Sequence, residues 1–275
     1  MVAKKVKRVV VKVGTSTLVQ KNGEVNLPVI DNLAFTLSAL NKRRLEVILV
    51  SSGAMGVGLE SLGLTKRPSA IAEQQALSSV GQLELMRIYS QRFLNYQTTV
   101  SQLLLTRDVL HYPVSRQHVL NTIEVLMEKR IIPIINENDP VSVDELDHHT
   151  TFSDNDELSA LVATRINADL LIILSDVDAL YTADPNRDPN AKPIKNLDHV
   201  TSNVEAGAAG TSTRFGTGGM ITKLRAAKMM MEDQRQMVLC NGRDPRIIID
   251  ILKGKQVGTH FGYDQLANSI EEDSK

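Results

Sequence analysis

The sequence predicts an α/β fold in which a mostly parallel central sheet is sandwiched by helices. Apolar, β-rich runs recur along the chain, and their hydrophobicity is continuous rather than alternating, as in strands buried on both faces. Helical stretches separate these runs, which is the order expected for a parallel sheet covered by helices on both sides. The strand candidates are residues 9–13, 47–50, 100–105, 131–135, 170–174 and 237–239, and the helix candidates are residues 29–42, 71–94, 119–129, 158–165 and 222–232.

Composition and charge narrow the class of protein. The chain has 275 residues, of which 42% are hydrophobic and 23% charged, the balance of an ordinary globular protein. The one cysteine, Cys240, excludes an intramolecular disulfide and a cysteine-based metal cluster. A formal net charge of −1 gives no argument for a nucleic-acid partner. The apolar run near the N-terminus is too short to cross a membrane and lacks a signal-peptide cleavage site, so we expect a cytoplasmic protein without a membrane partner.

We expect one domain, because no stretch has the composition of a linker between independent units. This domain covers residues 1–262, and a polar, acidic tail over residues 263–275 is a candidate for disorder. The stretch 199–219 is rich in Gly, Ala, Ser and Thr, which predicts a mobile loop within the domain.

Small, hydroxyl and carboxamide residues follow four of the predicted strands. Ligands of open parallel sheets bind at the carboxyl ends of the strands, so these residues are candidates for a binding site. Gly14 follows the first strand, in which Lys12 lies near the end, and Ser175-Asp176 follows the fifth strand. The other two segments are residues 51–58 and 136–139. Their clustering at one edge is stronger evidence than any single motif.

Three glycine-containing segments are candidates for binding phosphate. Gly14, the loop 53–58 and the stretch 216–223 allow the backbone to approach an anion closely, and N–H groups at helix starts favour phosphate. Lys223 would lie in the first turn of the helix that follows the third segment. For any one of these loops, glycines that only make a turn are an equally good interpretation. Walker A and GxGxxG patterns are absent, which argues against a P-loop NTPase and an NAD enzyme.

An acidic segment, residues 153–157, precedes a helical run. Asp or Asn in front of a helix is most often a helix cap. That interpretation is weaker for Asp156, because three acid or amide side chains converge there.

Taken in order, six segments resemble the amino acid kinase family. The resemblance extends from Lys7 to Phe261, and six ordered matches are far more specific than any one of them. The first loop, residues 12–16, fits aspartokinases and nucleoside monophosphate kinases less well than it fits the members that phosphorylate glutamate. The six segments are VVKVGTST, LVSSGAMGVG, INEND, FSDNDELSAL, LSDVDALYTADP and GTGGMITKLRAA.

The resemblance implies transfer of a phosphoryl group from ATP, with Mg²⁺, to the γ-carboxylate of L-glutamate, the first step of proline biosynthesis. It implies that Lys12 and Lys223 contact the transferring phosphoryl group and that Asp156 holds the two lysines in place. The implied substrate-binding residues are Ser52, Gly53, Ala54, Asn136, Asp139 and Asn155. The implied nucleotide-binding residues are Lys12, Gly14, Ser175, Asp176, Thr217, Gly218, Gly219, Met220, Ile221, Thr222 and Lys223.

The chemistry of this reaction agrees with the residue types. A carboxylate acceptor is already ionised at neutral pH, with a reference pKa of about 4.3, so it needs no general base. Two anions must meet, and catalysis then depends on positioning and on positive charge around the phosphoryl group. Mg²⁺ would be held largely by ATP phosphates and water, so we expect no metal site built from protein side chains.

The resemblance has consequences for partners and for domain content. It implies a homo-oligomer, feedback inhibition by proline and a transient contact with glutamyl phosphate reductase. The helix 71–94 is a candidate oligomer interface. Many members carry a C-terminal PUA domain, which is not found here after residue 262. Ser153 stands where the family often has glycine, and Ser175 where it often has threonine.

Two other functions compete with this interpretation. One is a kinase of the same fold that acts on another carboxylate, a carbamate or a phosphate, for which extra Arg or Lys in the acceptor site would be expected. The segments there instead offer Ser52, Asn136 and Asp139, and Asp139 suits an ammonium group. The other is a non-catalytic sensor of amino acid or nucleotide, which would not need the two lysines and Asp156.

Overall fold

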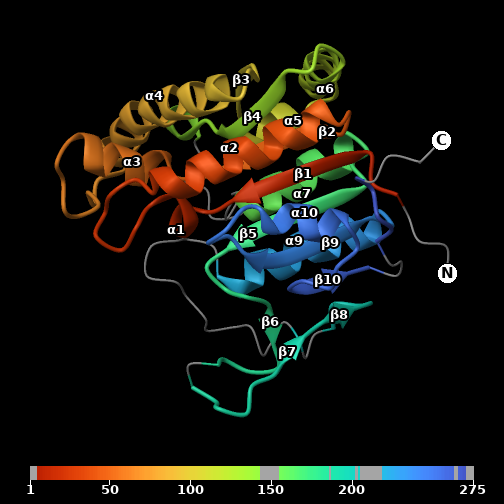
Figure 1. Cartoon of the computed structure of the whole chain (residues 1–275). Helices are drawn as coiled ribbons and strands as arrows, with labels where there is room; N and C mark the ends of the chain where they lie inside the picture. The colour runs from red at the N-terminus through yellow and green to blue at the C-terminus, as the bar shows by residue number, and fades with distance from the viewer. Residues whose placement is uncertain are drawn as a thin grey trace.

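In a computed structural model of the chain, a central sheet is covered by helices on both faces (Figure 1). The structure describes residues 5–142, 155–185, 187–201, 204, 219–262 and 266–270. The strands are β1 (Arg8–Val13), β2 (Glu46–Ser51), β3 (Val100–Leu105), β4 (Ile132–Glu137), β5 (Leu170–Ser175), β6 (Leu180–Tyr181), β7 (Pro193–Ile194), β8 (Asn196–Leu197), β9 (Gln236–Asn241) and β10 (Thr259–Phe261). The helices are α1 (Thr15–Leu18), α2 (Leu27–Lys42), α3 (Ala54–Ser61), α4 (Ile71–Asn95), α5 (Arg107–His111), α6 (Pro113–Glu128), the 3₁₀ turn η1 (Asp139–Val141), α7 (Asn155–Arg165), α9 (Met220–Glu232) and α10 (Ile247–Leu252).

The sheet is mostly parallel, as predicted. Within the described residues, eight strands form one sheet in the order β3-β4-β2-β1-β5-β9-β10-β8. Neighbours from β3 to β9 run parallel, whereas β10 runs antiparallel to β9. The strands β6 and β7 pair separately and lie below the main sheet in Figure 1. All six predicted strands are present, and the resulting parallel arrangement brings their carboxyl ends to one edge.

Each strand divides its side chains between two apolar layers. In β1, Val9, Val11 and Val13 pack with residues of α2, α4 and α10, whereas Val10 packs with residues of α6, α7 and α9. Successive side chains of a strand point to opposite faces, so Lys12 falls on the same face as Val10. The side chain of Lys12 is therefore directed to the side covered by α7 and α9.

The segment that follows β2, predicted as a loop, is the helix α3 from Ala54 onward. Gly53 makes the turn from strand to helix with a φ of +99°, a backbone conformation that residues other than glycine rarely adopt. The helix then packs closely on α4, because a Cβ atom on Gly81 would lie 1.8 Å from the carbonyl oxygen of Ala54. The loop prediction was wrong because glycines that disfavour a helix in isolation serve here for close helix packing.

The helix α4 has a buried face and an apolar exposed face. Leu85, Tyr89 and Phe93 are buried in the core, whereas Val80 and Leu83 are 40% and 76% exposed. Two apolar positions that help to predict this helix therefore lie on its outer surface.

Part of the C-terminal segment packs against the domain. The side chains of Leu266 and Ile270 are buried, and Ser269 accepts a hydrogen bond of 2.8 Å from the backbone N–H of Val6. The expected disorder of the tail does not hold for these residues, because they cover apolar surface of the core. The expected mobile loop over residues 199–219 lies almost entirely outside the described residues.

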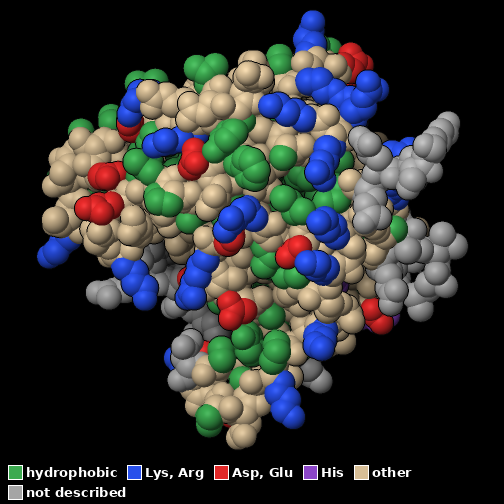
Figure 2. Space-filling view, viewed as in Figure 1, with side chains coloured by type: hydrophobic (Ala, Val, Ile, Leu, Met, Phe, Trp, Pro, Cys, Tyr) green, Lys and Arg blue, Asp and Glu red, His purple; other side chains and the backbone are tan. Residues whose placement is uncertain are grey.

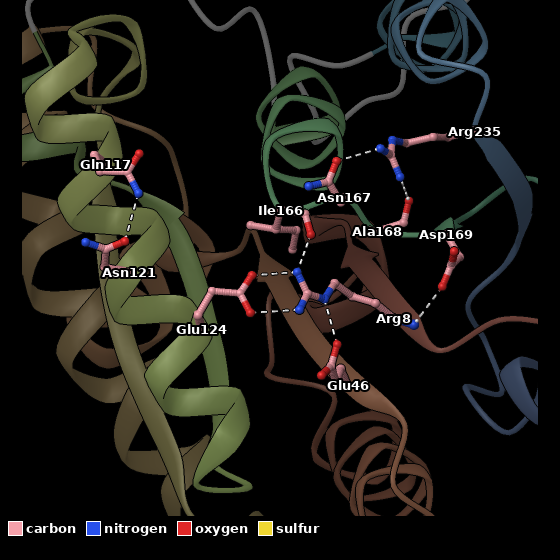
Figure 3. Close-up of polar contacts among 10 residues, drawn as sticks. All are labelled: Arg8, Glu46, Gln117, Asn121, Glu124, Ile166, Asn167, Ala168, Asp169 and Arg235. Carbon is pink, nitrogen blue, oxygen red and sulfur yellow. Dashed lines mark hydrogen bonds and ion pairs between the residues drawn. The ribbon is translucent and has the colours of Figure 1, made fainter.

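Arg8 joins several elements at the amino end of β1 (Figure 3), whereas the predicted site lies at the carboxyl ends of the strands. Its guanidinium donates to Glu46 Oε2 at 2.7 Å, to both carboxylate oxygens of Glu124 at 2.6 and 2.8 Å, and to the carbonyl of Ile166. The carboxylate of Asp169 accepts from the backbone N–H of Arg8 at 3.0 Å. These contacts connect β1, β2, α6 and the end of α7.

The surface shows no segregation of charge on the face seen in Figure 1. Lys and Arg side chains are interspersed there with acidic and hydrophobic ones (Figure 2). Among the described residues, no helix is both long and apolar enough to cross a membrane.

Candidate active site

Asp156 lies between two lysines at the carboxyl edge of the sheet. Its Oδ1 is 2.6 Å from the Nζ of Lys12 in β1, and its Oδ2 is 3.1 Å from the Nζ of Lys223 in α9. The hydroxyl of Thr222 donates to the same Oδ2 at 2.8 Å. Strand alternation in β1 directs Lys12 to this face, and the first turns of α7 and α9 deliver the other side chains. Residues distant in the sequence therefore form one ionic cluster.

The cluster is buried, which makes its charges interact strongly. The side chain of Asp156 is 0% exposed, and those of Lys12 and Lys223 are 4% and 8% exposed. Burial alone would raise the pKa of Asp156, but the nearby charges of Lys12 and Lys223 outweigh burial and hold that pKa below its usual range. Asp156 is therefore a carboxylate at neutral pH. Among the described residues, two lysines share this one carboxylate, so these three side chains carry more positive than negative charge.

Gly14 lies next to this positive charge. A Cβ atom at this position would lie 3.5 Å from the Nζ of Lys12 and 3.9 Å from the Oγ of Ser16. Lys12 therefore lies close to the backbone of a glycine at the strand end, and net positive charge beside such a backbone suits a phosphate. The side chains present therefore fit a nucleotide phosphate.

A second group of polar residues forms a hydrogen-bonded chain at the ends of β2 and β4. The side-chain amide of Asn155 donates to Ser52 Oγ at 2.9 Å and to Asn136 Oδ1 at 3.0 Å. Asn155 is the first residue of α7 and precedes Asp156, so the two groups of residues are adjacent. The structure brings together three of the predicted substrate-binding residues.

The helix α4 contributes two polar residues that the sequence analysis missed. Gln82 accepts a hydrogen bond of 2.7 Å from Asn136 Nδ2, and Tyr89 OH lies 2.9 Å from Ser51 Oγ. Both side chains are buried, and burial raises the pKa of Tyr89 even though its hydrogen bond to Ser51 opposes that shift. A polar residue on a long helix is usually exposed, so the sequence holds no local signal that Gln82 points inward.

The remaining predicted acceptor residues lie on the same edge. Gly53 is the N-cap of α3 and Ala54 its first residue, directly after Ser52. Asp139 is half-buried and begins η1, which follows β4. The start of α3 and the start of η1 therefore flank the chain formed by Ser52, Asn136 and Asn155.

The predicted nucleotide residues divide into two places. Ser175 ends β5, and its hydroxyl donates to Asp176 Oδ1 at 3.1 Å, but among the described residues no hydrogen bond joins this pair to the lysine cluster. The second place is the beginning of α9, where Gly219 is the N-cap and Met220 and Ile221 precede Thr222. Thr217 and Gly218 lie outside the described residues. Within the described residues, no three His, Cys, Asp or Glu side chains are grouped to hold a metal ion.

Comparison with known proteins identifies relatives along nearly the whole chain. Residues 7–241 match the model of the amino acid kinase family. The chain is 55% identical to the glutamate 5-kinase of Lactiplantibacillus plantarum, with 94% of this chain and 97% of the relative covered. It is 54% identical to the glutamate 5-kinase of Listeria monocytogenes, with coverage of 93% and 92%, and 51% identical to that of Enterococcus faecalis, with coverage of 93% and 94%.

Solved structures agree on the fold. The UMP kinase of Bacillus anthracis superposes with a TM-score of 0.62 at 16% identity, covering 94% of this chain and 96% of that one. The isopentenyl phosphate kinase of T. acidophilum gives a TM-score of 0.61 at 15% identity, covering 92% and 98%. At such identity the similarity concerns the fold alone. Together with the family match over residues 7–241, it confirms the resemblance on which the sequence analysis relied: the chain belongs to the amino acid kinase family.

Proposed function

We propose that the chain transfers the γ-phosphoryl group of ATP to the γ-carboxylate of L-glutamate, giving L-glutamyl 5-phosphate and ADP. The observation that carries phosphoryl transfer is the buried Asp156 between Lys12 and Lys223 at the carboxyl edge of the sheet. The identity of the acceptor is supported by relatives at 51–55% identity that are named glutamate 5-kinase.

In this proposal, the lysine cluster lowers the barrier by electrostatics. The glutamate carboxylate is ionised at neutral pH and attacks without a general base. Lys12 and Lys223 offset the charge on the phosphoryl oxygens, and Asp156 fixes both ammonium groups in place through contacts of 2.6 and 3.1 Å. Thr222 restrains the same carboxylate through its hydroxyl. Bound ATP with Mg²⁺ supplies the phosphoryl group, and its phosphates and water would hold most of the metal coordination.

The nucleotide and the acceptor would occupy opposite sides of this cluster. Ser175, Asp176 and the beginning of α9 are proposed for the nucleotide, together with Gly14, whose backbone lies close to Lys12. Ser52 and Asn155 are proposed for the acceptor, with the N–H groups at the start of α3 available for a carboxylate. Asp139 is proposed to accept hydrogen bonds from the ammonium group of glutamate.

A kinase for a phosphate acceptor remains the second candidate, because the fold is shared with UMP kinase and isopentenyl phosphate kinase. A phosphate acceptor would require cations around it. The described side chains that form the chain at the ends of β2 and β4 are instead neutral: Ser52, Asn136 and Asn155. Glutamate therefore fits better.

The purified chain with ATP, Mg²⁺ and hydroxylamine tests the proposal, because hydroxylamine traps an acyl phosphate as a hydroxamate. We expect hydroxamate with glutamate and little with N-acetylglutamate, which lacks the ammonium group. UMP and isopentenyl phosphate serve as control acceptors, and their phosphorylation is measured by the release of ADP. ADP release with a phosphate acceptor and no hydroxamate with glutamate would refute the proposal.

The same proposal extends to partners. Val80 and Leu83 on the outer face of α4 support a homo-oligomer built on this helix, measurable by light scattering of Leu83→Asp. Proline shares the α-carboxylate and ammonium of glutamate, so we propose that it inhibits by competing for the acceptor site and raises the KM for glutamate. We further propose a cytoplasmic location and transient contact with glutamyl phosphate reductase, since an acyl phosphate hydrolyses readily.

A further inference from the structure

Gln82 is a buried polar side chain that the proposed reaction does not use directly. It lies on the inner face of α4 and is 7% exposed. Its Oε1 accepts a hydrogen bond of 2.7 Å from Nδ2 of Asn136 at the end of β4. Strand alternation explains the contact, because Ile132 and Ile134 face the α4 side of the sheet and Asn136 continues that face.

This hydrogen bond fixes which way the amide of Asn136 points. Since Nδ2 faces Gln82, the oxygen Oδ1 faces the opposite way and accepts from Asn155 Nδ2 at 3.0 Å and from the N–H of Glu137 at 2.9 Å. Asn155 in turn donates to Ser52 Oγ at 2.9 Å. Asn136 therefore donates to Gln82, and Asn155 donates to both Asn136 and Ser52.

Reversal of the Asn136 amide would place its NH₂ group against the NH₂ group of Asn155. Two donors cannot pair, so Asn155 would turn as well and withdraw from Ser52. In the observed orientation, Oδ1 of Asn155 is buried and has no hydrogen-bond partner among the described residues. An acceptor in that state suits an N–H donor of a ligand, such as the ammonium group of an amino acid.

We propose that Gln82 is a positioning residue for the acceptor substrate: it holds Asn136 in one orientation, and through Asn136 it keeps Asn155 and Ser52 arranged for binding. This inference rests on the proposed function. Gln82 belongs to the acceptor side of the site, because its hydrogen bond goes to Asn136, whereas Lys12 and Lys223 pair with Asp156. Its removal should therefore change acceptor binding far more than nucleotide binding.

The substitution Gln82→Leu removes the amide and preserves most of the volume. Loss of one neutral hydrogen bond and the resulting disorder of the amide chain should raise the KM for glutamate by about three- to tenfold. The KM for ATP should stay unchanged. Ser78→Ala is the matched control, since Ser78 is buried one turn earlier on α4 and its Oγ has no partner among the described residues. That control should keep the KM for glutamate of the unmodified enzyme.

A double-mutant cycle with Asn136→Ala separates positioning from packing. If Gln82 acts through Asn136, then Gln82→Leu should add little to the effect of Asn136→Ala on the KM for glutamate. If Gln82 only fills space, the two effects should multiply, which would overturn the proposal. Gln82→Met, which keeps the chain length, is the second variant. Failure of both variants to fold would show that Gln82 holds the helix instead.

The unmodified enzyme is assayed first, so that two failures are distinguishable. No hydroxamate from glutamate with the unmodified enzyme would refute the proposed function, and the inference would fall with it. Normal turnover by the unmodified enzyme, together with an unchanged KM for glutamate in Gln82→Leu, would refute the role of Gln82 alone.

Discussion

Lys12 and Asp156 form an ion pair of 2.6 Å in which neither side chain is more than 4% exposed. Each comes from a different element, β1 and α7, and the second oxygen of the carboxylate is engaged by Lys223 and Thr222. A change at any one member therefore alters the interactions of the others.

Removal of one lysine should reduce turnover. Lys223→Ala deletes an ammonium group proposed to face the phosphoryl oxygens, and we expect kcat to fall by about 10²-fold or more. Lys12 still pairs with Asp156, so the circular dichroism spectrum should be preserved. Lys228→Ala, an exposed position on the same helix, is the control and should keep full activity. A near-normal kcat in Lys223→Ala would contradict the assignment.

Asp156→Asn should reduce both turnover and stability. The substitution preserves size, but it leaves two buried ammonium groups without their shared carboxylate, and breaking a buried pair costs roughly 3–5 kcal/mol. Urea unfolding measures the loss, with Asp108→Asn at an exposed position as the control. An unchanged kcat would indicate that Asp156 only stabilises the first turn of α7.

The contribution of Asp156 to the unfolding free energy should depend on pH, and comparison with Asp156→Asn measures that contribution. The pKa of Asp156 is lowered in the folded state, so its charge contributes stability above the unfolded pKa of about 3.9 and loses that contribution as pH falls through the folded pKa. The difference in unfolding free energy between the unmodified protein and Asp156→Asn should therefore be nearly constant above about pH 5 and shrink below it. A difference that instead shrinks between pH 5 and 8 would contradict a lowered pKa.

Asp139→Ala tests how the acceptor is recognised. A charge-assisted hydrogen bond to an ammonium group contributes roughly 1.5–3 kcal/mol, so the KM for glutamate should rise at least about tenfold. The KM for ATP should change much less, because η1 packs against α4, whereas α9 packs against α7 and β9. Asp108→Ala is the control. An unchanged KM for glutamate would mean that another group binds the ammonium group of glutamate.

Arg8→Met tests whether the opposite edge of the sheet is structural only. The variant loses the contacts to Glu46, Glu124 and Ile166 drawn in Figure 3. Because both glutamates are 40% or more exposed and regain water, we expect a loss of about 1–3 kcal/mol in unfolding free energy. The kcat of the folded enzyme should not change. Arg43→Met, at an exposed helix end, should leave stability unchanged, and a fall in kcat for Arg8→Met would reveal coupling to the site.

The strands could be predicted from the sequence because burial on both faces leaves a continuous apolar run, as in Leu170–Ser175. The placement of Lys12 near a ligand-bearing edge followed from the same argument. The helix after Gly53 could not be predicted, since its glycines have a use only once α4 packs against it. Gln82 could not be predicted either, because its partner Asn136 comes from another element and only the folded chain brings them within 2.7 Å.

The helix α4 carries an exposed apolar surface on one face and a residue of the proposed acceptor site on the other. Its outer face carries Leu83, and its inner face presents Gln82 to the proposed acceptor side. Gly81, next to Gln82, packs closely against Ala54 of α3. Nucleotide contacts are proposed on β5 and α9, on the far side of β1. A second copy bound at α4 would therefore contact the helix that carries Gln82 and not the elements proposed for the nucleotide.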